Sequence, residues 1–235
     1  MFYLYDIAKN GGYKDVVLGN LFIGGCSLRT HINNARTGRE NYIYFKNNAG
    51  EWVPHKNKPL LYGIQDEDWD IITLQQYSGH SGVVDTYNQD LDDLIAYVNK
   101  NKTNPQARLA WHMTWAYETT SDHPDFAIYN RNQKNMYNCI VNAVKSRIAD
   151  NQAFSFIIPA GTAIQTLRAS FIGENLTRDG YHLNNLGRYA AALCWYSVLL
   201  DKNIDKISFV PEGISLKQLE IVKRAVEMAV NYPLP

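Results

Sequence analysis

The segment "TRDGYHLNNLGRYAA" places Asp179 three residues before His182, just ahead of an apolar run. At that spacing the two side chains can lie on one side of a turn. The carboxylate would then accept a hydrogen bond from one imidazole nitrogen, which leaves the other nitrogen as a general base. The same spacing also suits a capping turn, with Asp179 on backbone N–H groups and His182 at the surface. Taken alone, the spacing favours the capping turn.

A second segment, "LFIGGCSLRTH", places Gly24 and Gly25, followed by Cys26 and Ser27, at an expected strand-to-helix turn. Glycines let backbone N–H groups approach a ligand, and a helix N-terminus favours negative charge, so the turn suits half of an oxyanion hole. The alternative is a tight turn in which Ser27 caps the helix and Cys26 is a small buried hydrophobe. Without further information the alternative is preferred.

Two further segments carry polar or aromatic side chains. "TLQQYSGHSG" leaves Gln75 and Gln76 past an expected strand, where a carboxamide N–H can complete an oxyanion hole or simply bond neighbouring loops. "HMTWAYETTSDH" offers Trp115, which can stack on a sugar or cap the core; the core interpretation is favoured slightly. The histidines are scattered, without HExxH or HxH spacing, so no metal site is predicted.

The elements that must position these residues alternate between short apolar strands and helices. Expected strands are 16–23, 71–74, "ARLAWHMTW" and "FSFIIP", which predicts a parallel sheet with helices on both faces. Ligands bind beyond the carboxyl ends of such strands. That rule selects the segments 24–31, 75–81, 114–123 and 173–184.

The helical pattern is clearest where Leu91, Leu94, Ile95 and Val98 follow one stripe. Further helices are expected at 2–9, 161–169 and 215–230, after Ser27, along the Tyr137–Ile148 stripe, and in the apolar run "LGRYAAALCWYSVLL". Residues 40–58 read as a β-hairpin insertion. One domain over residues 1–235 is predicted, with a core at 1–200.

Composition excludes several classes of protein. Lys plus Arg equals Asp plus Glu at 23 each, which argues against a general nucleic-acid binder. Three cysteines exclude a disulfide scaffold, and no apolar run approaches the roughly 20 residues of a membrane span. The N-terminus lacks signal-peptide features, but a signal could have preceded residue 1; the compartment, secreted or periplasmic among others, stays open.

Together these segments resemble the SGNH (GDSL-like) hydrolase superfamily, in a branch known largely as a domain of unknown function. "RDGYHLNNLGRYAAALCWY" is similar to its Asp-His block, "GNLFIGGCSL" to its oxyanion-glycine block, and "DWDIITLQQYSG" to a glutamine form of its third block. The resemblance implies a three-layer α/β/α sandwich with a flavodoxin-like parallel sheet. It also implies Asp179 and His182 as catalytic residues and Gly25 with Gln75 as oxyanion donors.

One departure concerns the nucleophile. The superfamily's first strand ends in a Gly-Asp-Ser or Gly-Asn-Ser motif that should precede helix 2–9, and this chain begins inside that helix. Strands 16–23 and 70–75 should then flank an empty slot. They must pair directly, or another segment or partner chain must fill the slot, or the functional chain is longer. An alternative is that "GGCSL" is the nucleophile turn, with Ser27 attacking.

The implied function is a serine ester hydrolase that removes acetyl or other acyl groups from a carbohydrate and needs no cofactor. As written, the chain lacks the nucleophile and is expected to be inactive. One rival is a non-catalytic carbohydrate- or ligand-binding domain on the same fold. A weaker rival is a metal- or phosphate-dependent enzyme of flavodoxin-like fold.

Overall fold

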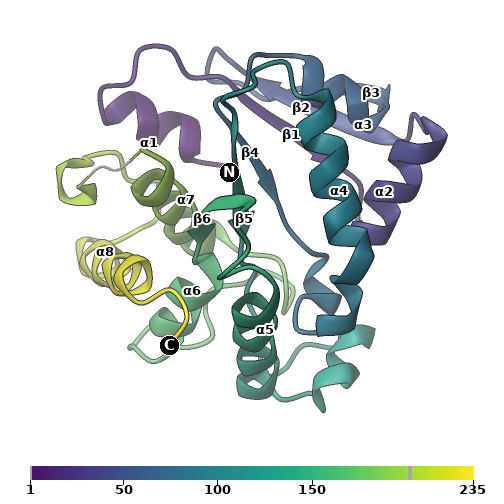
Figure 1. Ribbon diagram of the computed structural model, residues 1–235. Helices are drawn as coiled ribbons and strands as arrows, with labels where there is room; N and C mark the ends of the chain where they lie inside the picture. The colour runs from purple at the N-terminus through teal and green to yellow at the C-terminus, as the bar shows by residue number, and fades with distance from the viewer. Residues whose placement is uncertain (1, 201–202) are drawn as a thin grey trace.

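The computed structural model describes residues 2–200 and 203–235 (Figure 1). In these residues the chain forms an α/β fold with two three-stranded sheets. The strands are β1 (Leu18–Phe22), β2 (Tyr42–Asn47), β3 (Val53–Lys58), β4 (Ile71–Leu74), β5 (Arg108–His112) and β6 (Phe154–Ile158). The helices are α1 (Leu4–Asn10), α2 (Leu28–Thr37), α3 (Leu60–Gln65), α4 (Asn88–Asn101), α5 (Gln133–Arg147), α6 (Ala160–Arg168), α7 (Asn185–Leu200) and α8 (Leu216–Asn231).

Strands β4, β5 and β6 form a parallel sheet, as the alternation of strands and helices predicts, and their order in it is β4-β5-β6. On β5, Leu109 and Trp111 point to one face and Ala110 to the other, because successive strand residues alternate. The Ala110 face packs against α1, α6, α7 and α8, and the opposite face packs against α4 and α5. Figure 1 shows α6, α7 and α8 gathered on one side of the sheet. Helices therefore cover both faces.

The prediction that strand 16–23 belongs to the parallel sheet is wrong in the described part of the chain. β1 pairs antiparallel with β2, from Leu18 opposite Asn47 to Phe22 opposite Ile43. β2 in turn pairs antiparallel with β3. The physical reason is that the backbone N–H and C=O groups of a strand need hydrogen-bond partners, and the β2–β3 hairpin supplies them for one edge of β1. The hairpin is also more than an insertion, because Tyr42 and Tyr44 are buried.

In the described residues β1 and β4 do not pair with each other. The alternative in which strands 16–23 and 70–75 pair directly is therefore wrong for this part of the chain. Each of these strands has one edge without a ladder partner in the described ranges. The four residues of β4 are only half-buried, and so is β1 from Leu18 to Leu21. β1 still approaches the segment just before β4, because a Cβ on Gly19 would come within 2.8 Å of the Trp69 ring.

The helix predictions hold closely. The four residues of the α4 stripe are buried, α7 is buried nearly all round, and α6 and α8 match their expected ranges within a residue. A capping box joins Ser215 and Gln218 at the start of α8. In the part of the chain that the structure describes, no helix is long and apolar enough to cross a membrane.

Candidate functional site

Asp179 and His182 form a hydrogen-bonded dyad on the loop before α7. Asp179 Oδ2 lies 2.7 Å from His182 Nδ1, while Oδ1 accepts from the backbone N–H groups of His182 at 2.7 Å and Tyr181 at 3.3 Å. The capping turn and the oriented imidazole are therefore present at once. The His182 side chain is 54% exposed, and its Nε2 has no hydrogen-bond partner among the described residues. This geometry leaves Nε2 free to accept a proton.

The electrostatics of Asp179 follow from the same contacts. Partial burial alone would raise the pKa of its carboxyl group. Hydrogen bonds from the His182 ring and from two backbone N–H groups outweigh that effect and hold the pKa below its ordinary value. Asp179 is consequently a carboxylate at neutral pH. A carboxylate at Nδ1 fixes the tautomer of the ring and stabilises the imidazolium.

Backbone contacts close the dyad loop on itself. Thr177 and Leu183 form an isolated antiparallel bridge, and Arg178 N–H donates to the His182 carbonyl at 2.9 Å. Gly180, between the dyad residues, has φ +87°, and a Cβ there would come within 3.1 Å of Ser121 Cα. Only glycine fits this conformation without strain. The loop is a defined turn and not a loose connection.

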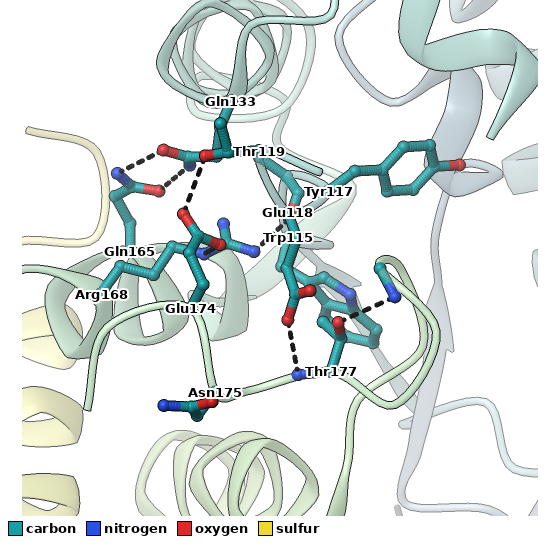
Figure 2. A network of polar contacts seen from close by, with 12 residues as sticks. Trp115, Tyr117, Glu118, Thr119, Gln133, Gln165, Arg168, Glu174, Asn175 and Thr177 are labelled. Carbon is teal, nitrogen blue, oxygen red and sulfur yellow. Dashed lines mark hydrogen bonds and ion pairs between the residues drawn. The ribbon is translucent and has the colours of Figure 1, made fainter. Parts of the chain in front are cut away.

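Three hydrogen bonds tie the dyad loop to the loop after β5. The Trp115 indole N–H donates to the Tyr181 carbonyl at 2.7 Å, and Glu118 N–H donates to the Gly180 carbonyl at 2.8 Å. The Glu118 carboxylate accepts from Thr177 N–H at 3.1 Å (Figure 2). Trp115 is half-buried and packs against the core. The structure thus places Trp115 as a support for the dyad loop.

Arg168 on α6 braces both loops from inside the molecule (Figure 2). Its Nη2 donates to the Ala116 carbonyl at 2.9 Å, and its Nε lies 3.2 Å from Glu174 Oε2. Glu174 Oε1 in turn accepts from the Thr119 hydroxyl at 3.1 Å. The Arg168 side chain is only 5% exposed. Burial lowers the pKa of its guanidinium, and the neighbouring Glu174 and Glu118 carboxylates partly offset this, so the group stays charged.

A series of aromatic rings runs from the dyad toward the loop after β4. The Tyr181 ring lies 4.3 Å from the His182 ring and 4.8 Å from the His123 ring, centroid to centroid. His123 also lies 4.8 Å from Tyr117 and 6.4 Å from Tyr77. These rings come from three different loops at the carboxyl end of the parallel sheet. They form one wall beside His182.

Tyr77 connects this wall to the glycine turn. Its hydroxyl donates to Asp125 Oδ2 at 2.7 Å and lies 3.3 Å from His123 Nε2. Its ring lies 3.7 Å from the position that a Cβ on Gly25 would occupy. Gly25 has φ +64° and is exposed. Ring contacts therefore link the Gly25 turn to His182 through Tyr77, His123 and Tyr181.

The residues beside Gly25 have structural roles in the described chain. Ser27 Oγ accepts from Thr30 N–H at 3.2 Å and lies 3.0 Å from the Thr30 hydroxyl, so it caps α2. No contact joins Ser27 to His182 in residues 2–200 and 203–235. Burial raises the pKa of the Cys26 thiol to about 11, which disfavours a thiolate nucleophile.

The two glutamines after β4 separate into one buried and one exposed side chain. Gln76 Oε1 accepts from Leu28 N–H at 3.1 Å and Tyr77 N–H at 2.8 Å. Its Nε2 donates twice to Thr86, to the carbonyl and to the hydroxyl. Gln76 therefore has no N–H left for an oxyanion. Gln75 is exposed and makes no hydrogen bond with the described residues, so it is the amide that remains available.

Of the remaining histidines, His112 is buried and accepts from the Trp195 indole N–H at 3.0 Å. Burial lowers its pKa to about 3, which makes it a neutral core residue. In the described residues no three His, Cys, Asp or Glu side chains gather closely enough to hold a metal ion.

A family model described as "Domain of unknown function (DUF4886)" matches residues 1–229. The chain belongs to the DUF4886 family. A crystal structure at 1.50 Å of a DUF4886 family protein from Bacteroides uniformis is similar, with a TM-score of 0.94 and 38% sequence identity. The match covers 99% of this chain and 90% of the other. No curated protein matches significantly.

Sequence reasoning missed several residues of this candidate site in the DUF4886 chain. Tyr77 and Tyr181 belong to the wall, Asp125 accepts the hydrogen bond from Tyr77, and Arg168 holds the loops together, yet the sequence pattern indicated none of these four residues. Tyr181 carried a weak signal, because it sits inside the dyad turn next to His182. Arg168 carried none, since an arginine on a helix is ordinarily exposed.

Proposed function

We propose that this DUF4886 chain supplies the base, the orienting carboxylate and the oxyanion donors of an SGNH-type serine ester hydrolase. The substrate class is a carbohydrate carrying O-acyl groups, acetyl above all. The observation that carries the proposal is the dyad: Asp179 Oδ2 at 2.7 Å from His182 Nδ1, with Nε2 free and exposed. The SGNH resemblance of the three sequence blocks supports the assignment of an ester substrate.

In this mechanism a serine Oγ forms a bond to the ester carbonyl carbon while His182 Nε2 takes the hydroxyl proton. Collapse of the tetrahedral intermediate breaks the bond to the sugar oxygen, which receives that proton from the imidazolium. Water then attacks the acyl-enzyme with the same proton transfers and releases the acid. Asp179 stays ionised throughout, consistent with its lowered pKa, and stabilises each imidazolium.

The oxyanion would be held by the Gly25 backbone N–H and the Gln75 side chain. Gly25 is an exposed residue in a turn with φ +64°. Gln75 has an uncommitted amide, whereas both N–H groups of Gln76 bond Thr86. Because Gln76 also accepts from Leu28 N–H at the start of α2, it fixes the β4 loop against the Gly25 turn. Its part in the proposal is therefore positioning.

The serine would arrive on a strand between β1 and β4. Each of these strands has one edge without a ladder partner among the described residues, and β4 is only half-buried along its whole length. A parallel strand of a sheet covered on both faces is ordinarily buried on both. An added strand that ends in Gly-Asn-Ser would cover this edge and bring its serine to the carboxyl end of the sheet, where His182 lies. The occupant that we propose is an N-terminal extension of the same polypeptide.

The test compares the chain as printed with the same chain extended at its N-terminus by an apolar strand ending in Gly-Asn-Ser. Both are treated with a fluorophosphonate probe, which forms a phosphorus–oxygen bond to an activated serine and expels fluoride. Both are then assayed on a small acetyl ester and on an acetylated oligosaccharide. We expect labelling and turnover only in the extended protein, and loss of both when its added serine becomes alanine.

A second control removes the base. His182→Ala in the extended protein should reduce hydrolysis by roughly 10³-fold or more. Labelling of Ser27 with turnover in the printed chain would refute the block assignment and make "GGCSL" the nucleophile turn. An extended protein that folds, with an unchanged circular dichroism spectrum, but neither labels nor turns over would refute the hydrolase. That result would favour the binding-domain alternative.

A further inference from the structure

A groove of about 450 Å³ lies beside the dyad loop. It lies between that loop, the first turns of α7, the segment 212–214 and the start of α8. Small-molecule sites commonly measure about 300–1,000 Å³, so one or two sugar rings match its size. None of the residues in the proposed catalytic machinery lines it. The groove is therefore an additional feature of the same end of the molecule.

Two arginines line this groove without a strong ion pair in the described chain. Arg178 is 52% exposed, and its nearest carboxylate contact places Nε 3.7 Å from Asp179 Oδ2. Arg188 has no ion pair in residues 2–200 and 203–235, and its guanidinium lies 4.8 Å from the centre of the Phe2 ring. A planar guanidinium binds a carboxylate through two parallel hydrogen bonds. Two such groups on one groove select an anionic ligand.

The remaining polar side chains narrow the ligand class. Glu212 also lines the groove and forms no ion pair with a described residue, so two positive charges face one negative charge. That balance matches a single carboxylate better than a phosphate dianion, which Glu212 would repel. Asn185 makes no hydrogen bond with described side chains, and Gln218 uses only its oxygen, in the α8 capping box. These amides and Glu212 offer both donors and acceptors, which neighbouring hydroxyl groups require.

We propose that this groove binds an acidic sugar, a hexuronate unit in the glycan that carries the ester. The inference rests on the proposed function for the ester itself, and it adds the charge of the substrate. Arg178 gives the physical connection, because it lines the groove and directly precedes Asp179. A glycan held in the groove would be anchored to the same loop that carries the catalytic dyad.

The test is a binding measurement that needs no hydrolysis. Isothermal titration calorimetry compares trigalacturonic acid with its methyl ester, which removes the charge and keeps the hydroxyl pattern. We expect the acid to bind about tenfold more tightly at low salt, and this preference to shrink as salt increases. Arg178→Gln and Arg188→Gln should each abolish most of the preference. Arg39→Gln, an exposed arginine outside the groove, changes net charge equally and should have no effect.

Several outcomes would overturn the inference: equal binding of acid and ester, no binding at millimolar concentration, or the same loss with Arg39→Gln. Equal binding of a triglutamate peptide would also overturn it, because the groove would then recognise any carboxylate. The experiments distinguish failure of the esterase proposal from failure of the acidic-sugar proposal. Preference for the acid without any esterase activity in the extended protein refutes only the hydrolase. Esterase activity on a neutral acetylated glycan, with no preference for the acidic trimer, refutes only the acidic groove.

Discussion

The Trp115 indole N–H donates to the backbone carbonyl of Tyr181 at 2.7 Å, across a sequence separation of 66 residues. The acceptor lies inside the Asp179–His182 turn, so the loop after β5 supports the dyad turn directly. Trp69 makes the same kind of bond elsewhere, from its indole to the Gly63 carbonyl at 2.8 Å. The two half-buried tryptophans form a matched pair for testing what the first bond does.

Trp115→Phe keeps a large ring and removes the donor. We expect a loss of about 1 kcal/mol in the free energy of unfolding, and Trp69→Phe should lose a similar amount. Only Trp115→Phe should change the NMR signals of the His182 ring, because only that bond reaches the dyad turn. Equal perturbation of His182 by both variants would contradict this role for Trp115.

Arg168→Ala should be the more damaging change. It leaves the Ala116 carbonyl without its donor and removes the cation beside Glu174, so we expect a loss of about 2 kcal/mol or more from the free energy of unfolding. Arg168→Lys keeps the charge but cannot bridge both partners, and should recover only part of that loss. The control is Arg224→Ala on α8, an exposed pair with Glu220, which should change stability by less than about 0.5 kcal/mol. Urea denaturation measures all three.

The pH dependence of stability should report on Asp179. Its pKa is lower in the folded protein than in the unfolded chain. The stabilising contribution is therefore fully present above the unfolded pKa and is lost as pH falls through the folded value. Urea unfolding between pH 7 and pH 2 should show a difference between wild type and Asp179→Asn that shrinks toward the acid end. Asp68→Asn, an exposed carboxylate without a hydrogen bond to described residues, should run parallel to wild type.

Alanine substitution of the two neighbouring glutamines should affect different properties: stability for Gln76 and catalysis for Gln75. Gln76→Ala leaves the N–H groups of Leu28 and Tyr77 without their acceptor, and should lower the free energy of unfolding by about 2 kcal/mol or more. Gln75→Ala should leave stability unchanged, because the side chain is exposed. In the extended protein, however, Gln75→Ala should lower kcat by about 10²-fold if its amide holds the oxyanion. Normal kcat in a folded Gln75→Ala variant would remove Gln75 from the site.

Sequence patterns predicted the helices α4 and α7 and the Asp179–His182 contact, because each of these features depends on residues close together in the sequence. The spacing of apolar residues in α4 and the continuous apolar run of α7 show which of their residues are buried. The Asp179–His182 contact requires only a separation of three residues. The partner of β1 could not be predicted this way. An apolar strand suits either a parallel or an antiparallel neighbour, and the choice depends on which strand reaches its edge.

The wall of aromatic rings and the contacts of Arg168 could not be predicted either, because they also join segments that are far apart in the sequence. Tyr77, His123 and Tyr181 stand on three loops, and no pattern within any one loop shows that the other two approach it. For Gln75 and Gln76, the sequence left two roles open, an oxyanion donor or hydrogen bonds to neighbouring loops, and did not assign them to one residue or the other. Only the contacts with Leu28 and Thr86 distinguish Gln76 from Gln75.

The open edge of β4 also bears on how the chain behaves at high concentration. Ile71, Ile72 and Leu74 lie half-buried on a short, uncharged strand whose outer backbone groups have no ladder partner in the described ranges. Such an edge is a template for another strand, from a second molecule as readily as from the same one. We therefore expect the printed chain to self-associate through this edge, in proportion to concentration. A strand seated beside β4 would act as a built-in solubility element as well as a carrier of chemistry.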